Sequence, residues 1–181
     1  VRKVLKWKAA AGEEGGKIWR NIGRCDQSVE GSLRNLARIS TAKPAMFQEV
    51  MEMLYDENPD EWDASGNEED CEIVTEMNAI RRKFSQIRVL LRRLGDEARC
   101  DIEPLAQMKL ADATMDVPGV LVSGVPGAGG HDAIVALLFT PTARRGVEEL
   151  WSTWAETQGG SSPRVCPLLL QANRGPGLIL H

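Results

Sequence analysis

The sequence predicts an α+β fold, with a helical first half followed by a half that mixes strands and helices. In the first half, apolar residues recur at spacings of three and four, which is the period of an amphipathic helix. After Pro118 the apolar residues instead form short runs beside glycine and proline, and runs of this length favour buried strands. This order of elements, with no internal repeat, indicates an α+β layer.

Two helices are expected in the first 55 residues. The periodic stripe predicts one from Lys17 to about Ile39, after an apolar stretch around Trp7 that the glycine-rich Ala11–Gly16 interrupts. A second, short helix is expected over Ala45–Tyr55, because Pro44 can occupy a first helical turn without losing a needed donor.

An acidic segment and a long helix follow. Residues 56–70 contain eight acidic side chains and nothing able to form a core, so they predict a solvated loop in which Trp62 has no assigned role. Residues 71–95 have the strongest helical period of the chain, with Gly95 placed as a C-cap. A helix packed on its own domain is favoured over a coiled-coil partner, because only about three heptads are present. The apolar stripe of this helix comprises Ile73, Met77, Ile80, Phe84, Ile87, Leu91 and Leu94.

The second half is expected to arrange strands and helices around one glycine-rich loop. On the amphipathic helix near the C-terminus, Trp151 and Trp154 share the apolar face and are interpreted as core residues. The expected elements are a helix at Pro104–Thr114, strands at Gly119–Val125 and Ala133–Phe139 around the loop Pro126–Gly130, a helix at 142–157, and strands at Val165–Gln171 and Gly177–Leu180.

Composition excludes several classes of function. A net charge of −4 and a pI near 5.3 argue against a general nucleic-acid binder. No apolar run approaches the roughly 18 residues that cross a bilayer. Four widely spaced cysteines and two histidines predict reduced thiols in a cytoplasmic protein, with no metal site. The chain begins at Val1 rather than methionine, so we expect a piece of a longer protein.

The segment SGVPGAGGHD at 123–132 is the strongest candidate for a functional site. Glycines allow positive φ and let successive backbone N–H groups converge on an anion. The segment does not match the P-loop, because Gly130 and His131 stand in place of Lys and Ser/Thr. It also fails the dinucleotide and protein-kinase patterns, where Asp132 occupies the position of the third glycine. A tight connection between two strands is the alternative.

Two segments together resemble the GHMP small-molecule kinases. The run SGVPGAGGHDAI resembles their third conserved motif, in the form found in members that act on phosphomevalonate. The residues of 102–115 are similar to the upstream stretch I-E-P-x-x-Q-x-x-L-x-D-x-T-M of those members, and 87–95 is similar to the helix before it. The likeness is strongest over 80–140.

The resemblance implies a kinase that uses ATP and Mg²⁺ to convert 5-phosphomevalonate into 5-diphosphomevalonate, in the mevalonate route to isoprenoids. The ATP-cradling loop and the catalytic lysine of such kinases belong to an N-terminal half that this sequence does not contain. It therefore implies a segment at 1–56 that joins this missing half, an acidic loop at 57–70, and a GHMP-type C-terminal domain with a ferredoxin-like sheet at 71–181. Alternatives are another GHMP kinase, such as mevalonate kinase, or a non-catalytic phosphate-binding or regulatory module.

The resemblance also assigns candidate site residues. The candidates for contacting the transferred phosphate or ATP are Ser123, Gly127, Ala128, Gly129 and Gly130. Asp132, the last candidate of the loop, either orients the loop amides, supports a water bound to Mg²⁺, or caps its own loop. The candidates for binding the substrate anion are Arg88 and Arg92.

Neighbouring residues have more ordinary interpretations. Arg81 shares the helix face of the two arginines but is interpreted as a surface residue paired with an acid such as Glu76. Glu103 either faces the same cleft as Gln107 or caps a helix. His131 departs from the motif and is interpreted as a surface replacement.

Overall fold

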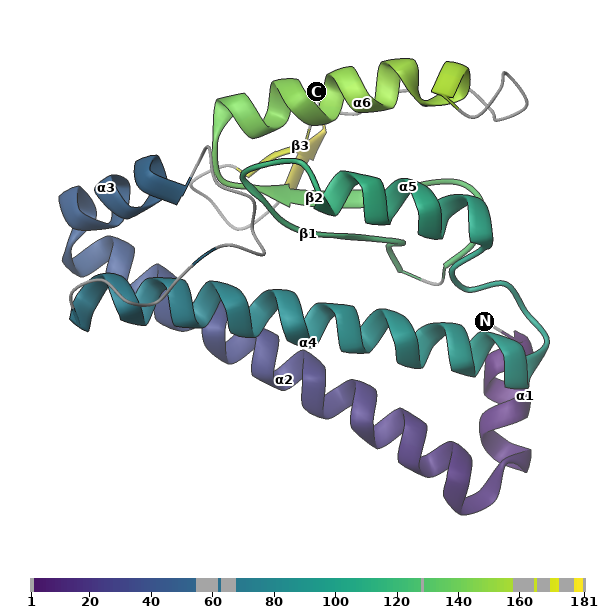
Figure 1. Ribbon diagram of the computed structural model, residues 1–181. Coiled ribbons are helices and arrows are strands. Elements are labelled where there is room, and N and C mark those ends of the chain that lie inside the picture. Colours follow the sequence, from purple (N-terminus) through teal and green to yellow (C-terminus); the bar gives the residue numbers. More distant parts are fainter. Residues whose placement is uncertain are drawn as a thin grey trace.

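Two long antiparallel helices form the base of the molecule (Figure 1). The computed structural model describes residues 2–54, 62, 68–127, 129–157, 165, 170–172 and 178–180. These residues form a mostly helical α+β structure with short antiparallel strands, which confirms the predicted class. None of the helices within these ranges is long and apolar enough to cross a membrane.

The first long helix begins earlier than predicted. Helix α1 (Arg2–Ala10) is followed directly by α2 (Gly12–Ala42). The glycine-rich stretch therefore interrupts the helical structure only around Ala11 and Gly12. Gly12 has φ +54°, which turns the chain, and Glu13 and Glu14 then place negative charge in the first turn of α2. The helix macrodipole favours carboxylates at that end, and this offsets the weak propensity of the glycines after them. Helix α3 (Pro44–Leu54) confirms the short second helix.

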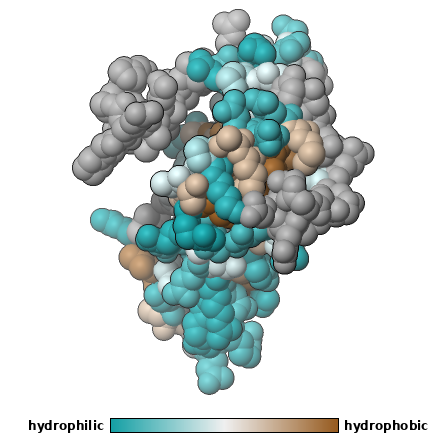
Figure 2. All heavy atoms as spheres, turned by 90° about the vertical axis from the view of Figure 1, so that its left-hand side faces the viewer, coloured by the Kyte–Doolittle hydropathy of each residue, from teal (hydrophilic) through white to brown (hydrophobic). Residues whose placement is uncertain are grey.

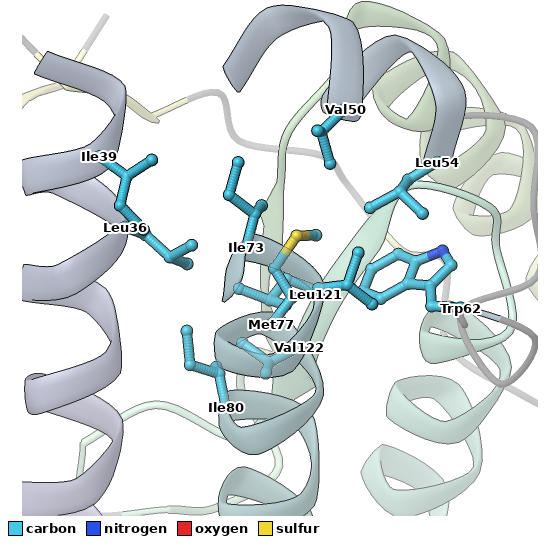
Figure 3. Packing of buried hydrophobic residues seen from close by; sticks show 11 residues of the cluster. Leu36, Ile39, Val50, Leu54, Trp62, Ile73, Met77, Ile80, Leu121 and Val122 are labelled. Atoms are coloured by element: carbon cyan, nitrogen blue, oxygen red, sulfur yellow. The ribbon is translucent and has the colours of Figure 1, made fainter. Parts of the chain in front are cut away.

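The second long helix, α4 (Glu68–Ala98), packs along α2 within the same chain, as predicted. Its stripe faces two apolar clusters. The larger joins α2, α3, α4 and the first strand, and Figure 3 shows Ile73 and Met77 of α4 lying between Leu36 of α2 and Leu121 of the strand. The smaller contains Ile18, Leu94 and Ile102.

The prediction for the acidic segment was wrong in two respects. Glu68–Asp70 form the first turn of α4 rather than a loop, at the helix end that tolerates carboxylates. Trp62 is only 5% exposed and packs beside Leu54 and Leu121 in the larger cluster (Figure 3). A single aromatic residue produces no period, so the pattern of the sequence gave no sign of this anchor. Residues 55–61 and 63–67 lie outside the described ranges.

Gly95 lies inside α4 and is not its C-cap. The chain folds back at the helix end, where the Cys100 N–H donates to the Gly95 carbonyl at 2.9 Å. A Cβ on Gly95 would lie 2.7 Å from the Cys100 oxygen, so glycine is needed for this close approach. The left-handed residue that ends the helix is instead Arg99, with φ +51°.

Replacing Arg99 with glycine is therefore expected to stabilise the protein. The left-handed conformation costs a residue with a Cβ about 1 kcal/mol, and glycine avoids that cost. The contact at this position is preserved, because Lys3 donates to the backbone oxygen of Arg99. Urea unfolding should show Arg99→Gly more stable by about 0.5–1 kcal/mol. Arg99→Ala is the control, and a gain of the same size in that variant would assign the effect to the lost charge.

The strand pair that flanks the glycine loop was predicted correctly. Strands β1 (Val120–Gly124) and β2 (Val135–Leu138) pair antiparallel, with Gly124 opposite Val135. Every residue of β1 is buried against α4 and α5 (Leu105–Met115), and α5 confirms the expected short helix. Strand β2 was expected to be buried, but it exposes Val135 and Leu137 on one face because only its other face meets α5 and α6.

The last elements cover this pair. Helix α6 (Pro141–Thr157) packs on α5 and β2, and the Trp151 Nε1–H donates to the Thr114 hydroxyl at 2.9 Å. Trp151 and Trp154 are half-buried, rather than fully buried as core residues would be. Strands β3 (Leu170–Ala172) and β4 (Leu178–Leu180) pair with each other only, so the described strands form two separate pairs and not the single small sheet that was expected.

The end of the molecule at α3 combines polar and apolar surface. Figure 2 shows apolar residues near the middle of this face and a mostly hydrophilic lower part, where α2 lies. Met53 on α3 is about half exposed here. The candidate residues of the glycine loop belong to the other part of the fold, where β1, α5 and the C-terminal half of α4 meet.

Candidate functional site

The two segments that resemble the GHMP kinases meet in space. The Gly130 N–H donates to the Ile102 carbonyl oxygen at 2.9 Å, so the glycine loop rests on the segment that precedes α5. Gly129 has φ +76°, and a Cβ there would overlap that oxygen and lie 2.7 Å from the Ile102 Cα. Only glycine allows the two backbones to approach this closely.

A side chain from α5 adds a second contact to the loop. Gln107 donates through Nε2 to the His131 carbonyl oxygen at 2.6 Å. The His131 imidazole is exposed, as predicted, and its Nε2 lies 3.6 Å from an Asp101 carboxylate oxygen. Residues on both sides of Ile102 therefore contact the C-terminal end of the loop.

A buried ion cluster lies directly beside Ile102. Both oxygens of Glu103 are occupied: Oε1 accepts from the Nε–H of Arg88 at 2.6 Å, and Oε2 accepts from Arg92 Nη1 at 2.6 Å. The Glu103 side chain is only 2% exposed. Asp112, whose side chain is exposed, lies 2.7 Å from Arg88 Nη2. Two guanidinium groups thus meet two carboxylates, and burial of both partners makes the contact between Arg88 and Glu103 the most costly to remove.

The capping role considered for Glu103 is wrong. Pro104 is the N-cap residue of α5, and no side-chain hydrogen bond caps that helix. The carboxylate of Glu103 points instead toward α4. Two charge-assisted hydrogen bonds from arginines stabilise a carboxylate more than the N-terminus of one helix does.

The arginines of α4 differ in the donors that they leave available. Arg88 is buried, and its donors point to Glu103, Asp112 and the Met108 carbonyl oxygen. Arg92 has a side chain 31% exposed and uses only Nη1 within the described ranges, so Nε and Nη2 remain available. Of the two predicted anion ligands, Arg92 has the geometry to reach a ligand from solvent.

Arg81 is not the surface residue that was expected. Its Nη1 donates to the Val120 carbonyl oxygen at 2.9 Å, and its guanidinium lies 5.6 Å from the centre of the Trp62 ring. Glu76, its expected partner, accepts from Asn35 on α2. The helical spacing of the arginines predicts that they share one face of α4. It does not predict their partners, because these lie on other elements of the fold.

The loop offers fewer free backbone donors than the glycine pattern suggests. The Gly129 N–H donates to the Pro126 oxygen at 3.2 Å, and the Gly130 N–H is bonded to Ile102. Gly127 is exposed with φ +62°, and its N–H has no partner in the part of the chain that the structure describes. Ala128 lies outside the described residues.

Ser123 and Asp132 lie in contrasting environments at the two ends of the loop. Asp132 is exposed. Ser123 is fully buried in β1, and its hydroxyl has no hydrogen-bond partner in the described structure. The adjacent Gly124 leaves room for α4, since a Cβ there would lie 3.0 Å from the Phe84 ring and 3.4 Å from Arg88 Cδ.

Comparison with known proteins relates the chain to phosphomevalonate kinases. It is 30% identical over 154 residues to the peroxisomal phosphomevalonate kinase of Arabidopsis thaliana, covering 84% of this chain and 30% of that protein. It is 28% identical over 155 residues to phosphomevalonate kinase erg8 of Aspergillus fumigatus, covering 85% and 26%. With the Candida albicans phosphomevalonate kinase it shares 31% identity over 139 residues, covering 77% and 27%.

The chain thus spans less than a third of the length of these relatives. No family model and no solved structure matches it.

Proposed function

We propose that the chain is the C-terminal part of a phosphomevalonate kinase, which transfers the γ-phosphate of ATP to 5-phosphomevalonate and yields 5-diphosphomevalonate and ADP. The observation that carries the proposal is the contact between the glycine loop and Ile102, because it joins the two segments that resemble this class of kinase. The names of the curated relatives support the same reaction and do not favour mevalonate kinase or a non-catalytic module.

The wider assignments form part of the same proposal. Residues 71–181 correspond to a GHMP-type C-terminal domain, and residues 1–56 lie at the junction with a half that binds ATP and supplies the catalytic lysine. The cytoplasm is the proposed location, although the Arabidopsis relative is named as peroxisomal.

In this proposal the chain binds and orients the acceptor. Phosphomevalonate carries a phosphate and a carboxylate, and the free Nε and Nη2 donors of Arg92 match either group as a fork. The Gly127 N–H adds a fixed dipole at the exposed side of the loop. Phosphoryl transfer depends mainly on such positioning and on electrostatic stabilisation. The buried Arg88 orients Arg92 through Glu103 rather than touching the substrate.

The fit to ATP and Mg²⁺ is incomplete within this chain. The described residues contain no group of three His, Cys, Asp or Glu side chains that would hold a metal ion. The glycines are also not followed by the Lys–Ser/Thr pair that binds a triphosphate in P-loop proteins. Binding of the nucleotide and of the metal ion is therefore assigned to the ATP-binding half.

The test is binding of phosphomevalonate to this chain, followed by NMR of backbone amides and arginine Nε–H groups. We expect the signals of Gly127 and Arg92 to shift on titration, and mevalonate, which lacks the phosphate, to bind at least about tenfold more weakly. Arg92→Gln should abolish the shifts. Arg93→Gln is the matched control on the same helix, where the exposed Arg93 pairs with Glu97 one turn along.

Catalysis is tested separately by coupled ADP release with Mg-ATP, using this chain alone and together with the N-terminal part of a full-length relative. Activity that depends on phosphomevalonate is expected only in the combined sample. Equal binding of mevalonate and phosphomevalonate, or no shift at the loop, would overturn the proposed function.

A further inference from the structure

Glu103 makes more contacts than a structural anchor of α4 requires. One buried carboxylate is neutralised by one guanidinium, and Arg88 alone would provide this through the contact to Oε1. The second oxygen is nevertheless bound to Arg92, a side chain that reaches solvent. A buried anion that holds an exposed cation limits the directions in which that cation points, because a charge-assisted hydrogen bond is short and directional.

Glu103 directly follows Ile102, the residue whose carbonyl group holds the glycine loop. The carbonyl of Ile102 is the acceptor for Gly130, and the next residue along the backbone is Glu103. Before the loop, Gly124 lies beside Arg88, since a Cβ on Gly124 would be in van der Waals contact with Arg88 Cδ at 3.4 Å. A chain of contacts therefore runs from Arg92 and Arg88 to Glu103, and through the backbone of Ile102 to Gly130.

We propose that Glu103 is a positioning residue, whose carboxylate holds Arg92 and the glycine loop in one fixed relation so that both face the same anionic ligand. The inference rests on the proposed function for the identity of the ligand, which is the phosphate-bearing acceptor. The chain of contacts does not depend on that function, so the two can fail separately.

The test compares Glu103→Gln with Asp112→Asn. Both substitutions remove a carboxylate that contacts Arg88, but Asp112 touches neither Arg92 nor the loop support, and its side chain is exposed. Glu103→Asp is a second variant. It keeps the charge and shortens the side chain by one methylene, so that it can serve one arginine but not both. Measurements are made at a temperature where all variants are folded, as judged by slow exchange of the Leu36 amide, which lies inside α2 at a residue of the larger cluster.

Three readouts are followed, and two of them need no ligand. For Glu103→Gln and Glu103→Asp we expect the Gly130 amide to exchange at least about tenfold faster, with the Leu36 amide changed by less than about threefold. The Nε–H signal of Arg92 should move toward that of a freely rotating arginine. The dissociation constant for phosphomevalonate should rise at least about tenfold, whereas Asp112→Asn should leave all three readouts near wild type.

Each result decides the question. Unchanged exchange at Gly130 and an unchanged Arg92 signal in folded Glu103→Asp would overturn the positioning role, as would equal effects of Asp112→Asn. If wild-type protein does not bind phosphomevalonate, the proposed function fails, and the exchange and arginine signals still decide whether Glu103 fixes the loop and Arg92.

Discussion

Gly129→Ala is expected to detach the glycine loop from its support and to destroy the candidate site. The new Cβ would overlap the Ile102 carbonyl oxygen and lie 2.7 Å from the Ile102 Cα. Both are backbone atoms, so no side-chain rotation relieves the clash. The loop must move away, losing the hydrogen bond from Gly130 and retaining the strain of a positive φ. We expect a loss of about 2–3 kcal/mol in the free energy of unfolding and no detectable binding of phosphomevalonate.

Gly127→Ala is the matched control for that substitution. Gly127 also has positive φ, at +62°, but a Cβ there meets no atom within 4 Å. Only the conformational cost of about 1 kcal/mol should remain. Urea unfolding and the NMR titration together measure both variants. Equal losses in the two would show that the close contact with Ile102 contributes nothing beyond backbone strain.

Arg88→Met is expected to be the most destabilising substitution in the ion cluster. Methionine fills much of the space of the arginine stem but leaves the buried Glu103 with Arg92 as its only cationic partner. Because Arg92 still compensates the charge of Glu103, the expected cost is that of the lost charge-assisted hydrogen bonds in a buried site, about 1.5–3 kcal/mol. The free energy of unfolding, measured by urea with circular dichroism, should fall by about this amount.

Arg93→Met provides the comparison on the adjacent position of α4. Arg93 is exposed and pairs with Glu97 one turn along the helix at 3.1 Å. Exposed pairs of this kind contribute about 0.3–0.5 kcal/mol. If the two substitutions cost the same small amount, the contacts of Arg88 are screened by solvent and the cluster does not stabilise the fold.

The regular helices could be predicted because their burial repeats along the sequence. The stripe from Ile73 to Leu94 was predicted correctly, since five of its seven members are buried and Phe84 and Leu91 are half-buried. The start of α2 was missed because glycines before Lys17 weaken the pattern, although the carboxylates of Glu13 and Glu14 favour a helix there. The prediction that Gly95 is a C-cap was wrong because a glycine near a helix end has two possible explanations. It can end the helix, or it can allow the close approach of two backbone segments, as it does here.

The candidate site could be predicted in its residues but not in its contacts. The resemblance identified both segments and the two arginines, yet nothing in the sequence shows that Arg88 and Arg92 share one carboxylate. Glu103 follows a turn after α4, and such a pairing depends on how the chain folds back. Trp62 was missed for the same kind of reason, because its neighbour Leu121 on β1 is distant in sequence.

Ile102 belongs both to an apolar cluster and to the contact that holds the glycine loop, and this affects how the protein responds to warming. Its side chain belongs to the smaller cluster of three buried residues, whereas the larger cluster has eleven. A small apolar cluster at the end of a helix pair opens at lower temperature than a large one. Since the carbonyl of the same residue holds Gly130, warming should release the loop while most of the molecule is still folded. The protein would then lose its ligand several degrees before its main core melts, and its working range would be set by the weaker cluster.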